Sequence, residues 1–318
     1  MWYIKESNNI EEILDNKQFG FPTIIRKIIY LYKYIFNNPT IRQIENGYIY
    51  IIPVNLKKEK MNDNKICAKM IKVLKKYNVK NVALSKYLNT RQDFKNYIYS
   101  QNIHILNGRK LFNILAIDCL KYITEKQNVN LENTEVTVLV NDVTDINIGN
   151  IKLISENAKI VSVVSKNINK LRSLTNQIYE ENGSLIKLSN NIKKSLSRAK
   201  LILNIDFPEE LLNKYNIYNK SIIININENI KIQRKAFLGI TIQYFDCNLP
   251  LKYIHILKDN KLCDSFDRTV ICESLICIKD TFNNLRKRVE KENIRICGLI
   301  GNKMRISDDE FEKSIDKS

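Results

Sequence analysis

The chain has 318 residues, of which 44% are apolar, so it can bury two hydrophobic cores. No apolar run approaches the roughly 18 residues that cross a bilayer, and the first residues do not form a signal peptide, so we expect a cytoplasmic protein with no membrane partner. Seven cysteines without a C-x-x-C pair give no sign of a disulfide framework or a zinc site, and no metal is expected.

The first 127 residues alternate helices with short strands, which predicts a small α/β domain. Residues 1–36 are predicted to be helical, and the apolar residues of a helix at 22–36 are expected in the core or at an interface with the other domain. A hairpin through Asn46-Gly47 should follow. The remaining predicted elements are strands at 48–56, 81–85 and 103–106 and helices at 63–77, 91–101 and 108–126.

A second domain is predicted over residues 128–250, because short apolar strands alternate there with amphipathic helices. This alternation is typical of a parallel sheet with right-handed crossovers, a Rossmann-like doubly wound fold. Residues 251–318 are expected to add a helix and a hairpin that pack back on the domains. The predicted strands are 136–140, 160–164, 184–188, 201–205, 221–226 and a further one at 239–245.

The predicted strand ends of this second domain carry polar residues. Ligands of open parallel sheets bind at the carboxyl ends of the strands, near the point where the strand order reverses. The candidates at these ends are Asn141, Asp142, Ser165, Lys166, Ser189, Asn190, Asn204 and Asp206. Turn chemistry alone also enriches Asn, Asp and Ser at such positions, so a structural explanation stays open.

Three segments share their register and turn positions with a known family. They are TVLVNDVTDINIGN (137–150), SKNINKLRSLT (165–175) and SRAKLILNIDFP (197–208). Together they resemble the NAD(P)-binding domain of shikimate dehydrogenases and glutamyl-tRNA reductases. The resemblance implies that Lys166 takes the place of an arginine that faces the 2′-phosphate of NADP, and that Lys170 matches a lysine of the same motif.

The resemblance also assigns the first and last of these segments. It implies that Asn141, Asp142 and Val143 line the turn for the diphosphate, and that Asn204 and Asp206 stand beside the nicotinamide. Ser165, Ser189 and Asn190 complete the predicted cofactor site at neighbouring strand ends.

The family uses a lysine and an aspartate for proton transfer in the cleft between its domains. Lys86, at a strand end of the first domain, is the best-placed lysine, so Lys86 and Asp206 are the candidate catalytic residues, with NADP as cofactor. Asn141, Val143 and Ile146 stand where the family has three glycines, and two of them are β-branched. Whether the chain is an enzyme therefore stays open, and no cofactor is expected if the turn is degenerate.

Three functions are compatible with these patterns. The favoured one is an NAD(P)-binding, shikimate-dehydrogenase-like oxidoreductase, or a degenerate relative, that binds a small-molecule or nucleotide ligand between its domains. The alternative is a non-catalytic metabolite sensor or protein scaffold. A net charge of +17 suggests nucleic acid, but the charge is spread along the chain, which disfavours that partner. Gly108-Arg109 is a further candidate for binding an anion, and homo-oligomerisation is left open.

Overall fold

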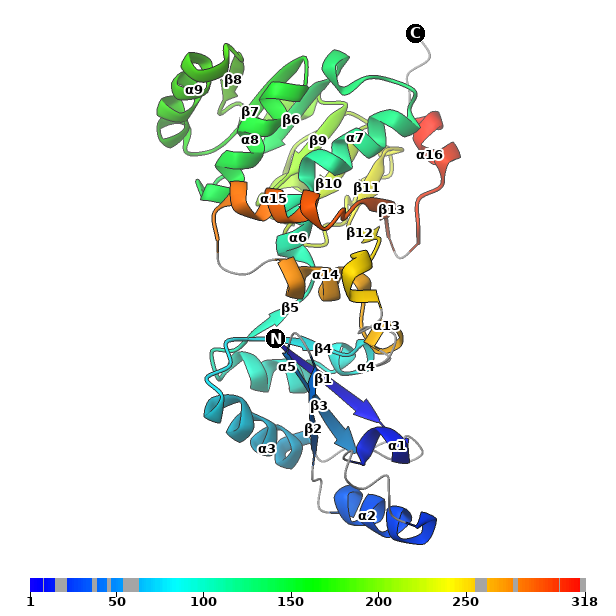
Figure 1. Cartoon of the computed structure of the whole chain (residues 1–318). Helices are drawn as coiled ribbons and strands as arrows, with labels where there is room; N and C mark the ends of the chain where they lie inside the picture. The colour runs from blue at the N-terminus through cyan, green and yellow to red at the C-terminus, as the bar shows by residue number, and fades with distance from the viewer. Residues whose placement is uncertain are drawn as a thin grey trace. The chain divides into compact units, whose positions relative to one another are not determined.

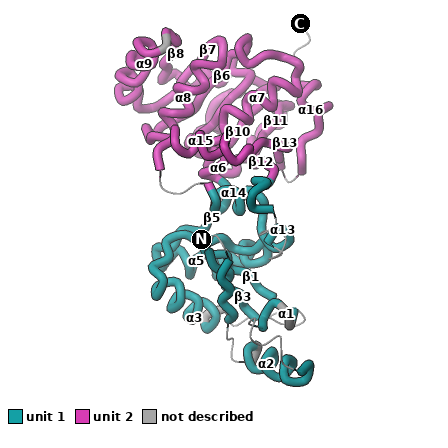
Figure 2. The backbone as a smooth tube through the Cα atoms, viewed as in Figure 1, with its two compact units in different colours: residues 1–108, 249–275 teal, residues 109–248, 276–318 magenta. Residues whose placement is uncertain are grey.

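A computed structural model describes the chain over residues 1–7, 9–14, 22–35, 39–44, 47–53, 63–254, 262–276, 280–302 and 304–314. The chain forms two compact units, coloured separately in Figure 2. Unit 1 comprises Met1–Gly108 and Leu249–Leu275, and unit 2 comprises Arg109–Asn248 and Ile276–Ser318. The helical stretch at 108–126 is thus part of unit 2, and the segment after residue 250 is shared between the units.

Unit 1 is built on a five-stranded sheet in the order β2-β3-β1-β4-β5 (Figure 1). Four strands are parallel, and only β2 runs antiparallel, as one arm of the predicted hairpin with β3. The strands are β1 (Trp2–Ser7), β2 (Thr40–Ile44), β3 (Gly47–Pro53), β4 (Asn81–Leu84) and β5 (His104–Leu106). The helices are α1 (Ile10–Ile13), α2 (Thr23–Ile35), α3 (Asp63–Lys76), α4 (Lys86–Thr90), α5 (Gln92–Tyr99) and α13 (Leu262–Ser265), and α14 (Arg268–Ile276) ends at the boundary with unit 2.

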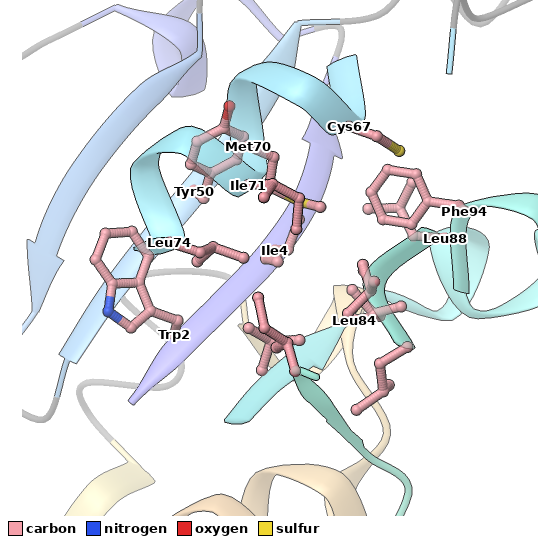
Figure 3. Packing of buried hydrophobic residues seen from close by; sticks show 14 of the residues in the cluster. Trp2, Ile4, Tyr50, Cys67, Met70, Ile71, Leu74, Leu84, Leu88 and Phe94 are labelled. Carbon is pink, nitrogen blue, oxygen red and sulfur yellow. The ribbon is translucent and has the colours of Figure 1, made fainter. Parts of the chain in front are cut away.

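Both faces of the unit 1 sheet are covered by apolar side chains. On one face, Met70 and Leu74 of α3 pack against Ile4 of β1 and Tyr50 of β3 (Figure 3). On the other face, Tyr3 of β1 joins a cluster with Phe266 and residues of α14. Burial of this apolar surface on two sides is the main stabilisation of a parallel sheet.

Strand β1 corrects the prediction that the chain begins with helices. It lies at the centre of the sheet, parallel to both β3 and β4. Its polar residues are paired within unit 1: the Lys5 ammonium lies 3.0 Å from the Glu12 carboxylate, and Glu6 accepts a hydrogen bond from the Ser85 hydroxyl at 2.5 Å. This pairing offsets the cost of placing charges in a buried strand.

Helix α2 contributes only part of its apolar surface to the core of unit 1. Ile24, Ile28, Leu31 and Tyr32 are all more than half exposed, which corrects their predicted place in a core. Tyr30 packs against the apolar cluster of unit 1 and Lys33 is buried. An interface of α2 with the other unit stays a prediction.

Unit 2 contains a six-stranded, fully parallel sheet in the order β11-β10-β9-β6-β7-β8. Counted from β8, this is the order 3-2-1-4-5-6 of the doubly wound dinucleotide-binding fold, which confirms the predicted α/β fold class. The strands are β6 (Glu135–Leu139), β7 (Ile160–Val164), β8 (Ile186–Ser189), β9 (Leu201–Asn204), β10 (Ile222–Asn225) and β11 (Ile240–Ile242).

Helices surround this sheet, and a small second sheet is joined to it (Figure 1). The predicted strand at 239–245 is divided: β11 extends the parallel sheet, while β12 (Tyr244–Cys247) pairs antiparallel with β13 (Ile296–Ile300). The helices are α6 (Arg109–Ile114), α7 (Ala116–Lys126), α8 (Asp145–Asn157), α9 (Ile168–Asn182), α10 (Ile192–Leu196), α11 (Glu209–Lys214), α15 (Phe282–Lys291) and α16 (Asp308–Lys313). Within the described ranges no helix is long and apolar enough to cross a membrane.

Candidate functional site

The fold of unit 2 selects one edge of its sheet as the candidate site. Strand β6 lies between β7 and β9, and the chain leaves it toward β7 and later returns to β9 on the other side. The strand order therefore reverses at β6, and the carboxyl ends of β6, β7 and β9 are where ligands of this fold bind. We call residues 140–144, between β6 and α8, the first turn, and residues 165–167, between β7 and α9, the second turn.

The first turn is closed by a carboxylate from the neighbouring loop. Asp206, which follows β9, accepts a hydrogen bond from the backbone N–H of Asn141 at 2.6 Å and another from the backbone N–H of Asp142 at 2.7 Å. Backbone N–H groups of this turn hold the diphosphate in the dinucleotide-binding fold. A carboxylate of the protein itself thus occupies two of these donors.

The ionisation of Asp206 is disfavoured by its surroundings. Burial raises its pKa, and the nearby carboxylate of Asp142 acts in the same direction, while the two backbone hydrogen bonds lower it; the net effect is a raised pKa. A second anion at this turn would meet both carboxylates. Coulomb repulsion therefore opposes a diphosphate here while Asp206 is ionised.

The start of α8, which follows the first turn, is capped by a side chain of the protein. The Thr144 hydroxyl caps the helix by accepting a hydrogen bond from the Asn147 N–H at 3.2 Å. The Asp145 carboxylate accepts one from the Phe282 N–H at 2.7 Å, which ties α8 to α15. Gly149 permits this approach, because a Cβ there would lie 2.1 Å from the Phe282 ring. Val143 is half-buried in the same turn.

The second turn leads into a helix that has no side-chain cap. Ser165 is buried, and its hydroxyl accepts a hydrogen bond from the Asn167 N–H at 3.0 Å. Helix α9 then begins without a side-chain cap and without an acidic residue in its first turn. The N–H groups of Ile168 and Asn169 have no acceptor within the described part of the chain.

Two lysines lie at this uncapped helix start. Lys166 precedes α9, Lys170 lies in its first turn, and both side chains are exposed. Neither ammonium group forms an ion pair with a described residue. The Lys166 N–H makes only a long hydrogen bond of 3.4 Å to the Asn141 side chain. Free N–H groups, the positive end of the helix dipole and two cations together favour an anion.

The end of β8 contributes turn residues rather than free donors. The Ser189 hydroxyl accepts a hydrogen bond from the Asn191 N–H at 3.1 Å and lies 3.2 Å from the Ser195 hydroxyl. Asn190 is exposed beside it. The Ser189 carbonyl accepts a hydrogen bond from the Ser165 N–H at 3.1 Å, which joins this turn to the second turn.

Asn204 is committed to the interior of unit 2. Its amide group donates to the Phe207 carbonyl at 3.1 Å and to the Asn225 side chain at 3.0 Å, and its carbonyl accepts from the Phe207 N–H at 3.0 Å. The side chain is 2% exposed. These contacts fix the loop after β9, which carries Asp206, so Asn204 helps to position Asp206.

Arg109 has a structural role that sequence reasoning missed. Its guanidinium donates to the backbone carbonyls of Asn225, Ile226 and Gln243 at 2.8 to 3.0 Å and lies over the Tyr244 ring. The Arg109 guanidinium, which was predicted from the sequence to bind an anion, is therefore hydrogen-bonded to backbone carbonyls of the protein. The chain thereby fastens the start of unit 2 to the carboxyl ends of β10 and β11.

Lys86 belongs to unit 1, where it is the first residue of α4 after the helix cap Ser85. Its ammonium lies 3.4 Å from the Asp264 carbonyl. Its pairing with Asp206 of unit 2 as a catalytic couple stays a prediction. No group of three or more His, Cys, Asp or Glu side chains that could hold a metal ion is found where the structure describes the chain.

Comparison with solved structures found matches of low identity and low TM-score. L-Tryptophan dehydrogenase from Nostoc punctiforme is 13% identical over 92% of this chain and 87% of that chain, with a TM-score of 0.31. Ornithine carbamoyltransferase from Pyrococcus furiosus is 10% identical over 86% and 83% of the two chains, with a TM-score of 0.29. Thermococcus litoralis Δ1-pyrroline-2-carboxylate reductase, solved with NADH and L-proline, is 9% identical, and the match spans only 36% of each chain at a TM-score of 0.26.

No protein-family model and no curated protein sequence matches the chain. These similarities assign no function to the chain, and the candidate function rests on the residues of the site.

Proposed function

We propose that unit 2 binds a phosphorylated nucleotide of the NADP(H) type and recognises its 2′-phosphate at the second turn. The observation that carries this proposal is the uncapped start of α9, flanked by Lys166 and Lys170, which are exposed and form no ion pair with a described residue. A phosphate there would accept hydrogen bonds from free N–H groups and face two cations without displacing any protein carboxylate. The resemblance to the NADP-dependent dehydrogenases assigns the same role to Lys166.

The occupied N–H groups of the first turn affect how the diphosphate of such a ligand would bind. A diphosphate would have to displace the Asp206 carboxylate from the N–H groups of Asn141 and Asp142. We infer that the 2′-phosphate contributes most of the affinity and the diphosphate little. In the reductase form of the proposal, Lys86 and Asp206 serve as the proton-transfer groups.

Calorimetric titration with 2′,5′-ADP and 5′-AMP tests the proposal, because the two ligands differ in the 2′-phosphate and neither has a diphosphate. We expect 2′,5′-ADP to bind at least tenfold more tightly, since one charged hydrogen bond contributes about 1.5 kcal/mol or more. Lys166→Gln should remove most of this difference. Lys159→Gln is the matched control, because Lys159 is an exposed lysine that precedes β7, whereas Lys166 follows it.

Titrations with NADPH and NADH complete the test. If NADPH, NADH and 2′,5′-ADP all fail to bind at millimolar concentration, the proposal is wrong. Equal affinity of NADPH and NADH would remove the role given to Lys166 but leave nucleotide binding intact.

A second function is favoured by the first turn itself. Because Asp206 accepts from the N–H groups of Asn141 and Asp142 and Thr144 accepts from that of Asn147, these three donors have partners without a dinucleotide. We propose as the alternative a non-catalytic sensor or scaffold. It predicts no reductase activity on a panel of small carbonyl compounds, together with a non-dinucleotide ligand in a thermal-shift screen or a protein that co-purifies.

A further inference from the structure

Helix α2 of unit 1 presents an apolar stripe to solvent. Ile24, Ile28, Leu31 and Tyr32 are 74%, 59%, 51% and 54% exposed. Their spacing of four, three and one residues places them on one side of a helix. Single exposed apolar residues are ordinary on protein surfaces, but a continuous stripe along a helix marks an interaction surface.

The orientation of α2 is fixed by its opposite side. Lys33 is buried, and its ammonium donates to the Ile13 carbonyl at 3.0 Å and to the Thr40 hydroxyl at 2.9 Å. Tyr30 packs against the apolar cluster of unit 1. In Figure 1, α2 projects from this unit next to α1. Rotating the helix to hide its stripe would break these contacts, so the apolar side stays outward.

The charge of α2 has one sign. Arg26, Lys27 and Lys33 lie on the helix, and Thr23–Ile35 contains no acidic residue. The Arg26 Nε atom has no hydrogen-bond partner among the described residues, and Lys27 is exposed beside the stripe without an ion pair to a described residue. The helix therefore offers apolar surface together with the exposed Lys27, whose charge no described residue neutralises, and no acidic residue of its own.

We propose that α2 is an interfacial helix that binds the surface of an anionic lipid bilayer. The stripe would enter the boundary between headgroups and acyl chains, the Tyr32 hydroxyl would stay at the polar level, and the exposed Lys27 beside the stripe would contact lipid phosphates. A second copy of the chain fits less well, because pairing two such helices would bring like charges together with no carboxylate on either helix. This proposal is independent of nucleotide binding and departs from the absence of a membrane partner expected from sequence.

Co-sedimentation of the full-length protein with lipid vesicles tests this inference. We expect binding to vesicles of 70% phosphatidylcholine and 30% phosphatidylglycerol, and at least tenfold weaker binding to pure phosphatidylcholine. Ile28→Asp should weaken binding to the anionic vesicles at least tenfold. Leu238→Asp is the matched control, because Leu238 is a 74% exposed apolar residue in unit 2, and this variant should bind like the unchanged protein.

Fluorescence gives a second readout that does not depend on sedimentation. The only tryptophan, Trp2, is 5% exposed, so a Tyr32→Trp variant adds a reporter on the stripe. Its emission should shift to shorter wavelength with anionic vesicles and stay unchanged with neutral ones.

Three results would overturn the inference. One is no binding to anionic vesicles at low salt. Another is equal binding by the unchanged protein and Ile28→Asp, which would show attraction by the net charge of +17 alone. The third is a dimer in light scattering that Ile28→Asp dissociates, which would assign the stripe to a second copy.

Discussion

The first and second turns of unit 2 hold equivalent places after neighbouring parallel strands, yet they are finished in opposite ways. At the first turn, the Asp206 carboxylate takes the N–H groups of Asn141 and Asp142, and Thr144 caps the helix that follows. At the second turn, the helix starts without a cap, beside Lys166 and without an acid in its first turn. The two turns therefore differ in whether protein side chains already occupy the backbone N–H donors at the strand end.

A turn without the glycine motif can prevent diphosphate binding in two ways: bulky side chains can fill it, or another group of the protein can occupy its N–H donors. The non-glycine residues of the first turn do not fill it with buried side chains, since Val143 is only half-buried. The donors themselves remain and are occupied by a side chain from 65 residues further along the chain. The change is one of charge and hydrogen bonding as much as of shape.

The largest expected effect is that of removing the Asp206 carboxylate, which closes the first turn. Asp206→Ala removes the acceptor of two backbone N–H groups, and we expect the free energy of unfolding to fall by about 2 kcal/mol, because water can restore part of the lost hydrogen bonding. Urea unfolding followed by circular dichroism measures this. Asp142→Ala is the control, since it keeps the bonded N–H and removes only an exposed carboxylate. Equal stability of Asp206→Ala and the unchanged protein would mean that the turn is not held by this contact.

A carboxylate introduced at the second turn should compete with a bound phosphate for the N–H groups there. Asn167→Asp places a carboxylate at the start of α9, where it can cap the helix and repel a bound phosphate. We expect the affinity for 2′,5′-ADP to fall about tenfold while the melting temperature stays the same or rises slightly. Asn167→Ala, which adds no charge, should bind nearly as well as the unchanged protein. An unchanged affinity in Asn167→Asp would place the phosphate elsewhere.

Helix capping gives a smaller difference between the turns. Thr144→Ala removes a side-chain cap and should lower the free energy of unfolding by about 1 kcal/mol. Asn167→Ala removes a side chain that makes no cap and should cost only a few tenths of that. The two variants are compared by thermal melting under the same conditions. Equal losses would contradict the view that α8 is capped by a side chain and α9 is not.

The smallest effect is a pH dependence at the first turn. Because the folded protein raises the pKa of Asp206 above its ordinary value of 3.8, the folded state binds this proton more tightly than the unfolded state. The stabilisation from this site is complete below about pH 3.8 and is lost as the pH rises through the pKa of the folded protein. The melting temperature of the unchanged protein relative to Asp206→Asn should fall over that range. A difference that instead grows with pH would show that the hydrogen bonds outweigh burial.

Most of unit 2 could be predicted from the sequence, whereas part of unit 1 could not. In unit 2, short apolar strands and periodic helices alternate regularly, and each signal is local. Strand β1 of unit 1 has no alternation of apolar and polar residues, because Trp2, Tyr3 and Ile4 are all buried in a sheet covered on both faces. Its Lys5 and Glu6 are paired by residues elsewhere in the unit, which the local sequence does not reveal.

For the candidate site, the rule that the carboxyl ends of parallel strands share one edge of the sheet was enough to predict that Asn141, Asp142 and Asp206 lie near one another. It could not say that Asp206 would point at the N–H groups of the first turn, since that depends on the path of two loops and on the buried Asn204 beneath them. Likewise, the apolar pattern of α2 marked a helix but not the side that faces solvent.

The sequence by itself determined the alternation of strands and helices in unit 2, its doubly wound class and the polar character of its strand ends. These properties follow from local periodicity and from the limited ways in which strands and helices can connect. The tertiary structure alone decided which donors stay free, which carboxylate closes the first turn, and that α2 keeps its apolar stripe outside. Such features depend on contacts between residues far apart in the chain, and the hydrogen bonds and burial that fix them exist only after folding.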